Sequence, residues 1–136
     1  MRDYKKLFFA TLSFFVLTMA TAYPWHMIWF HNLYVEMGAV TRPEPIMPLG
    51  IAAVLIQGIV IAYLYPLYYK GGNPVVQGVK FSLIMGLMVY TVMAFATAAK
   101  IRIEPVSTFL LYSTVFSCIQ FTVTGVALGL IYGRKN

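Results

Sequence analysis

Two histidines have the widest chemical use of any side chains in this sequence, and both lie among aromatic residues. A neutral imidazole is a common ligand for metals and haem. His26 and His31 are five residues apart, which places them on different faces of an ideal helix, and the sequence has no other histidine. Because coordination of a metal usually needs three or four converging groups, we expect no metal site and no cofactor. The neighbours Trp25 and Trp29 are typical of an aromatic anchor at a lipid-water interface.

The richest collection of acid-base groups lies close to these aromatic residues and in two connecting segments. The group comprises His26, His31, Glu36, Glu44, Lys100, Arg102 and Glu104. A shallow site formed by this group of residues is the best location for a ligand. Its candidate ligand-binding residues are His26, Trp25, Trp29 and Glu104. The sequence shows no nucleophile-base pair, so we predict no catalytic residue. A site that combines His26 with Glu104 would revive an enzymatic function.

Two glutamines are the strongest polar residues in the middle of long apolar segments. Gln57 and Gln120 lie on different segments, and their amides could hydrogen-bond if the helices touch, contributing about 1 kcal/mol. They could join helices or contact a ligand, and Tyr90 is a third candidate for a ligand contact. The middle of each apolar segment carries no charge, which disfavours transport driven by a buried carboxylate.

Four apolar segments must position these side chains. The stretch from Pro45 to Tyr69 carries no charged residue. About 20 apolar residues cross the roughly 30 Å hydrocarbon layer as a helix, which satisfies every backbone hydrogen bond. With 60% apolar and 10% charged residues, the chain is predicted to be an all-α membrane protein, a single transmembrane domain of four helices in an up-down bundle. The helices are expected at about residues 7–30, 46–69, 78–99 and 106–132.

Proline and glycine predict where these helices bend, end and pack. Pro24 removes a backbone donor and should kink the first helix or loosen a turn near residues 20–23, and Gly38 is a reasonable helix terminator. Small residues let backbones approach closely in lipid, where apolar burial gives little drive for helix association. The predicted helix-packing glycines are Gly58, Gly86, Gly125 and Gly129, the last two at GxxxG spacing.

The basic residues predict the orientation in the membrane. Four crossings place both termini on one side, with the connection between the second and third helices. That side holds Arg2, Lys5, Lys6, Lys70, Lys80, Arg134 and Lys135, and the opposite side holds Arg42, Lys100 and Arg102. Seven against three predicts both termini in the cytoplasm, and in a bacterial cell this means the cytoplasmic (inner) membrane. The net charge of +6 is spread over loops and termini, which favours the lipid bilayer over nucleic acid as the partner.

Two stretches of sequence carry a resemblance to a known group of proteins. They are GIVIAYLYP, residues 58–66, and GLMVY, residues 86–90. Together with the layout of the segments, they resemble an uncharacterised family of small bacterial four-helix integral membrane proteins of unknown function. The resemblance implies a fold and no activity. Members carry acidic residues within segments one, three and four, where this chain has Ala22, Ala94 and Ser117, so the role of those acids does not carry over.

Two functions of different classes fit these features. Small size, helices without buried charge and small-residue surfaces favour a non-enzymatic accessory or assembly subunit, docked to other membrane subunits. The alternative is a module that binds or transports a lipid or small hydrophobic molecule, either alone or as a homodimer. The aromatic cluster and the hydroxyl-rich fourth segment favour this alternative; the hydroxyl residues are Ser113, Thr114, Ser117, Thr122 and Thr124. An integral membrane enzyme ranks third.

Overall fold

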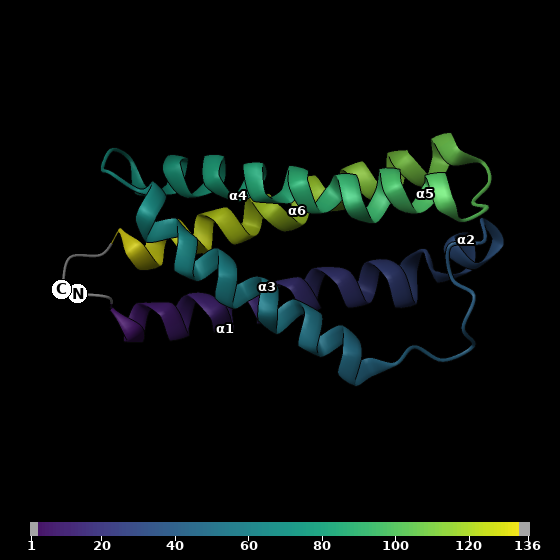
Figure 1. Cartoon of the computed structure of the whole chain (residues 1–136), viewed down its shortest axis with the longest axis horizontal. Helices are drawn as coiled ribbons and strands as arrows, with labels where there is room; N and C mark the ends of the chain where they lie inside the picture. Colours follow the sequence, from purple (N-terminus) through teal and green to yellow (C-terminus); the bar gives the residue numbers. More distant parts are fainter. Residues whose placement is uncertain (1–2, 134–136) are drawn as a thin grey trace.

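The structure describes residues 3–133, and this part of the chain contains eight helical segments. In this computed structural model the protein is all-α (Figure 1). The segments are α1 (Tyr4–Tyr23), the π-helix η1 (Pro24–Trp29), α2 (His31–Glu36), α3 (Met47–Tyr68), α4 (Pro74–Tyr90), the π-helix η2 (Thr91–Ala96), α5 (Thr97–Lys100) and α6 (Val106–Tyr132). Because η1 continues α1, and η2 and α5 continue α4, the chain forms four long helices.

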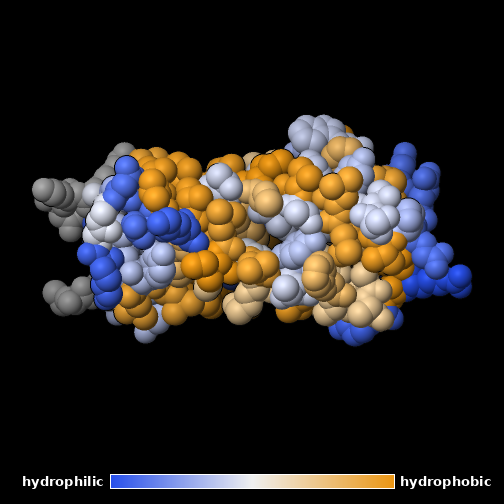
Figure 2. Space-filling model, turned by 90° about the horizontal axis from the view of Figure 1, so that it is seen from above, coloured by the Kyte–Doolittle hydropathy of each residue, from blue (hydrophilic) through white to orange (hydrophobic). Residues whose placement is uncertain are grey.

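Each of the four is long and apolar enough to cross a membrane. The candidate spans are Tyr4–Trp29, Met47–Tyr68, Pro74–Lys100 and Val106–Tyr132, of 22 to 27 residues. At 1.5 Å per residue, the shortest reaches about 33 Å, which exceeds the thickness of the hydrocarbon layer. Figure 2 shows a hydrophobic band between two hydrophilic ends. The prediction of an all-α protein with four long apolar helices is confirmed.

The helix α6 has the most extensive contacts of the four. α4 packs along α6, α1 packs against α6 as well, and α3 crosses α1 (Figure 1). Consecutive long helices run in opposite directions, so one end of the bundle holds the start of α1, the α3–α4 connection and the end of α6. We call this the terminal end. The opposite end, the α2 end, holds α2 and the α5–α6 connection.

Buried side chains form two separate groups along the bundle. The group at the terminal end draws on all four long helices and comprises Ala10, Phe14, Ile61, Ala62, Tyr65, Phe81, Phe121 and Leu128. The group at the α2 end comprises Tyr34, Met37, Ala94, Ile103 and Phe109. Among the described residues, α3 contributes to the first group only, because its first half tilts away from α4 (Figure 1). The bundle is therefore closely packed at the terminal end and open beside α3 at the α2 end.

Glycines bring the backbones of α4 and α6 into contact. A Cβ added at Gly125 would lie 2.6 Å from Val79 Cα, which is too close for any side chain. Gly129 lies against the backbone of Pro74 at the start of α4. Gly78 was not among the predicted packing glycines. It lies opposite Gly125, so a side chain at this position would clash with the backbone of α6 as well.

The other two predicted packing glycines each face an aromatic ring. A Cβ at Gly86 on α4 would lie 2.5 Å from the Phe121 ring of α6. A Cβ at Gly58 on α3 would lie 3.0 Å from the Phe14 ring, where α3 crosses α1. These positions set how closely the helices approach, since a larger side chain would force the rings to move.

Side-chain caps make two helices start earlier than predicted. Asp3 Oδ1 accepts hydrogen bonds of 3.1 Å from the backbone N–H groups two and three residues on, so α1 begins at Tyr4 rather than near residue 7. Asn73 caps α4 in the same way, and Pro74 suits the first helical position because it needs no donor there. The third long helix therefore begins at Pro74 rather than near residue 78.

The first long helix changes its hydrogen-bond pattern at Pro24. Proline has no N–H to donate to the preceding turn, and the helix loosens into a π-helix over Pro24–Trp29, directly after residues 20–23, where a kink or loosened turn was predicted. The helix then breaks at Phe30, so α2 is a separate short helix. Gly38 has φ +86°, a conformation that favours glycine, and it follows the end of α2 as predicted.

Candidate binding cavity

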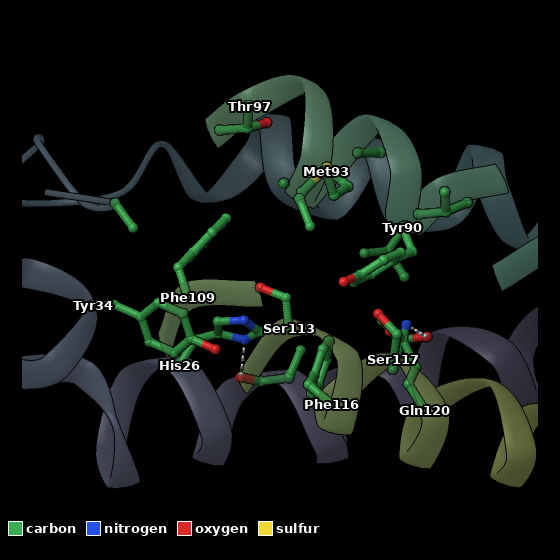
Figure 3. Close-up of a pocket in the computed structure, with 18 of the residues that line it drawn as sticks. His26, Tyr34, Tyr90, Met93, Thr97, Phe109, Ser113, Phe116, Ser117 and Gln120 are labelled. Carbon is green, nitrogen blue, oxygen red and sulfur yellow. Dashed lines mark hydrogen bonds between the residues drawn. The ribbon is translucent and has the colours of Figure 1, made fainter. Parts of the chain in front are cut away.

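A cavity of about 480 Å³ lies beside the diverging half of α3, close to the α2 end. Side chains from all four long helices line it, together with residues from both connections at the α2 end (Figure 3). Ala53 on α3 and Met93 on η2 line the cavity and are also exposed. The cavity therefore reaches the surface between α3 and η2, within the length of the candidate spans, and its lining is also exposed at Val40 in the α2–α3 connection.

His26 projects into this cavity from η1 (Figure 3). Its Nδ1 lies 3.0 Å from the Ala22 carbonyl oxygen, and because a carbonyl only accepts, this contact assigns the proton of a neutral ring to Nδ1. The ring packs against Tyr34 and Phe116, with centroid distances of 5.0 and 4.6 Å. The other nitrogen, Nε2, is then an acceptor, and no described residue donates to it.

Two π-helical segments contribute to the cavity lining. Such segments are wider than an α-helix and occur frequently at functional sites. In η1, the wider turn is closed by a 3.1 Å hydrogen bond from the Phe30 N–H to the Trp25 carbonyl. At the end of η2, Thr97 Oγ1 donates to the Val92 carbonyl, five residues earlier, at 3.1 Å. The cavity therefore lies where both helices depart from regular α geometry.

Tyr34 on α2 places a hydroxyl group beside the His26 ring. Its side chain is 3% exposed, and Oη accepts a 2.9 Å hydrogen bond from Trp25 Nε1. Burial raises the pKa of Tyr34 and outweighs the opposing effect of the Trp25 hydrogen bond, so the phenol keeps its proton. That proton has no acceptor among residues 3–133. Trp25, which donates the hydrogen bond to Tyr34 Oη, does not line the cavity itself.

Gln57 and Gln120 line the same cavity, but they do not hydrogen-bond to each other as the sequence suggested. Gln120 is 7% exposed and donates from Nε2 to Thr18 Oγ1 at 3.1 Å, which joins α6 to α1. Gln57 on α3 has no hydrogen-bond partner in the described part of the chain. The tilt of α3 explains the difference, since α3 makes little contact with α6.

Tyr90, at the end of α4, lines the cavity and also joins two helices. Its hydroxyl lies 2.6 Å from Thr114 Oγ1 on α6. Thr114 gives its own proton to the Leu110 carbonyl at 2.7 Å, so Tyr90 is the donor in the contact between helices. The Tyr90 hydroxyl therefore donates its proton to a side chain of α6.

Most of the residues that line the cavity were not among the sequence-based ligand candidates. They include Tyr34, Ser113, Phe116 and Ser117. Ser113, Ser117 and Gln120 follow one another at spacings of four and three, which places them on one face of α6. This spacing was a signal in the sequence, and it marks a polar stripe that faces the cavity.

The remaining predicted residues lie elsewhere. Trp29 is 67% exposed and does not line the cavity. Glu104 is exposed in the α5–α6 connection, where its carboxylate lies 3.4 Å from Arg102 Nε, and it does not meet His26 in the cavity. His31 is not a lining residue either, and its buried Nδ1 has no hydrogen-bond partner within the described range. Over the same range, no group of three or more His, Cys, Asp or Glu side chains could hold a metal.

In comparisons with known proteins, no family model, no curated protein and no solved structure matches this chain. The resemblance to small bacterial four-helix membrane proteins therefore stands only at a coarse level, that of four long apolar helices packed together. The geometry of the cavity is the basis for assigning a function.

Proposed function

We propose that this protein is an integral membrane protein that binds a small, largely apolar molecule in the cavity between α3 and η2. The supporting observation is a cavity of about 480 Å³ that carries polar groups within the length of the membrane spans. Ligand sites are typically clefts of about 300–1,000 Å³ with apolar walls and a few polar groups that fix orientation. His26, Tyr34, Gln57 and Gln120 supply such groups here.

The lining favours a neutral ligand. None of the residues that line the cavity is Asp, Glu, Lys or Arg, and an uncompensated charge is costly at membrane depth. A purely apolar ligand would leave the Gln57 amide and His26 Nε2 without partners, which is also unfavourable. A neutral molecule with a polar group and an apolar body satisfies both requirements.

The position of the opening favours entry from the bilayer. Ala53 and Met93 flank it from α3 and η2, and both are exposed. A Cβ added at Gly50, earlier on α3, would meet no atom within 4 Å, so this half of α3 leaves room beside it. The apolar body of a ligand would extend through this opening into the lipid.

The proposal includes an orientation, with the terminal end in the cytoplasm and the protein in the inner membrane. Its basis is the seven-to-three distribution of basic residues and the positive-inside rule. Of the seven, Lys5, Lys6, Lys70 and Lys80 lie in the described part of the chain, and Arg2, Arg134 and Lys135 lie outside the described residues. In this orientation the cavity occupies the outer half of the membrane.

Native mass spectrometry of the protein in lipid from its source membrane tests the binding function. Ala53 lines the cavity, whereas the adjacent Ala52 is exposed on α3 and does not. Ala53→Trp should fill the opening and remove a bound small molecule, and Ala52→Trp should retain it. A wild-type protein without a bound molecule, or equal occupancy in both variants, would contradict the proposal.

The role of accessory subunit, with other membrane subunits or a second copy as partner, stays a prediction from the sequence. Co-purification in mild detergent tests it, since a protein that always isolates alone would count against it. A partner and a bound small molecule are compatible, because the opening between α3 and η2 occupies only one side of the bundle.

A further inference from the structure

We propose, on the basis of the binding function above, that His26 and Tyr34 select a ligand whose polar group is a hydroxyl. The ligand class is a neutral alcohol or phenol with an apolar body. This inference depends on two neighbouring side chains, one with a free acceptor and one with a free donor. No described residue hydrogen-bonds to either of these two groups.

His26 offers an acceptor. Nδ1 donates its proton to the Ala22 carbonyl oxygen, 3.0 Å away, which leaves the lone pair of Nε2 for a donor. The ring is fixed between Tyr34 and Phe116, so its orientation is set before a ligand arrives. A donor from the described residues is absent, and a ligand that supplies one gains a hydrogen bond in apolar surroundings.

Tyr34 offers a donor next to that acceptor. Trp25 Nε1 donates to Tyr34 Oη at 2.9 Å, so one lone pair of Oη is occupied while its O–H remains to be donated. The rings of Tyr34 and His26 are 5.0 Å apart at their centroids. Both side chains line the cavity, so a ligand hydroxyl there can meet His26 as a donor and Tyr34 as an acceptor.

Only a group that both donates and accepts satisfies the pair. A hydroxyl donates to His26 Nε2 and accepts from Tyr34 at the same oxygen. An ether, ketone or ester accepts from Tyr34 but leaves Nε2 unpaired, and leaving a buried acceptor without a partner is costly. An ammonium group donates but cannot accept, and the cavity lining has no carboxylate to balance its charge.

Titration of matched alcohols and ethers tests this selectivity on the intact protein. The probes are hexadecan-1-ol and its methyl ether, and 4-dodecylphenol and its methyl ether, in nanodiscs, with affinities expressed per mole fraction in the bilayer. The chain has two tryptophans, so Trp29→Phe leaves Trp25, which hydrogen-bonds to Tyr34, as the only fluorescent reporter of tryptophan type. At least one alcohol should bind about tenfold or more tightly than its ether. The tighter alcohol identifies an aliphatic or a phenolic ligand.

Three outcomes separate this inference from the binding function. A preference for the hydroxyl supports both. Equal affinity of alcohol and ether would overturn hydroxyl selection and leave the binding function standing. No saturable binding of any probe, together with no bound molecule in native mass spectrometry, would overturn both.

Substitutions at the two histidines assign the selectivity to a residue. His26→Phe should remove the preference for alcohol over ether, whereas His26→Gln, which keeps an acceptor, should restore part of it. His31→Phe is the matched control, because His31 does not line the cavity, and it should leave the preference unchanged. A tenfold preference that survives in His26→Phe would overturn the role of His26. If that variant does not fold, the comparison of probes on the Trp29→Phe protein still decides the inference.

Discussion

The two glutamines face one cavity but differ in what holds them. The buried Gln120 amide donates to Thr18 and joins two helices, while the Gln57 amide has no partner among the described residues. A polar side chain at membrane depth stabilises the fold only when another group satisfies it. Gln120 should therefore contribute to the stability of the fold, and Gln57 should contribute to ligand binding.

Substitution of each glutamine by leucine separates these roles. Gln120→Leu should lower the free energy of unfolding by about 0.6 to 1.7 kcal/mol, the range for hydrogen bonds between membrane helices. Gln57→Leu is the matched control and should change it by less than about 0.5 kcal/mol, because no hydrogen bond within the protein is lost. Denaturant unfolding in mixed micelles measures both, and equal losses would contradict this assignment.

The residue types alone identified several cavity residues, because polar side chains are rare in apolar segments. His26, Gln57, Tyr90 and Gln120 all line the cavity, and their role in binding stays a prediction. Tyr34 could not be assigned to the cavity from the sequence. Its place beside His26 depends on the break of the helix at Phe30 and on α2 folding back. Both features depend on contacts between side chains rather than on a periodic pattern in the sequence.

At the scale of elements, the two ends of the bundle are built differently. α4 and α6 lie backbone to backbone through Gly78 and Gly125, so their contact has no room for an added atom. The first half of α3 has free space around Gly50. α4 and α6 are thus closely packed, whereas the first half of α3 diverges and forms one wall of the cavity.

The same substitution at two glycines tests this difference. Gly125→Ala places a Cβ 2.6 Å from Val79 Cα, so the backbones must separate and the free energy of unfolding should fall by about 1 to 3 kcal/mol. Gly50→Ala adds a Cβ in open space and should stabilise α3 by up to about 1 kcal/mol. The midpoint of thermal unfolding in detergent measures both variants. A stable Gly125→Ala protein would show that the helices are not in close contact there.

The sequence predicted the helices better than their distortions. Hydropathy predicted four long helices, because the length of an apolar run is a local property. Pro24 predicted a disturbance, but the form it takes, the π-helix η1 that carries His26, depends on which carbonyl the following N–H groups reach. The π-helix η2 contains no proline, so it lacked even that signal.

At the scale of the whole molecule, the bundle combines a packed half and an open half. The packed half, at the terminal end, has a core from all four long helices, and the cavity occupies the other half. The tilt of α3 that creates the opening follows from contacts between residues far apart in sequence, such as Gly58 with Phe14. No local pattern in the sequence predicts such an angle.

Cysteine labelling tests the proposed orientation. Cys118→Ser removes the one native cysteine, and Glu44→Cys or Lys70→Cys then places a single thiol at an exposed site at either end. A membrane-impermeant maleimide should label Glu44→Cys in intact cells and Lys70→Cys only after permeabilisation. Six basic residues still remain at the terminal end in the second variant, so the positive-inside bias is kept. The reverse pattern would place the cavity in the inner half of the membrane.

Photo-cross-linking from within the bilayer tests most directly whether the cavity binds a molecule that enters from lipid. The probe is a derivative of the tighter-binding alcohol, hexadecan-1-ol or 4-dodecylphenol, with a diazirine on its alkyl chain. Activated in nanodiscs, it should label cavity residues such as Ala53, Met93 and Ser117, as located by peptide mass spectrometry. Excess of the same alcohol without the diazirine should abolish this labelling. Labelling confined to outward residues such as Ala52 and Val92, without saturation or competition, would show that the cavity is not a binding site.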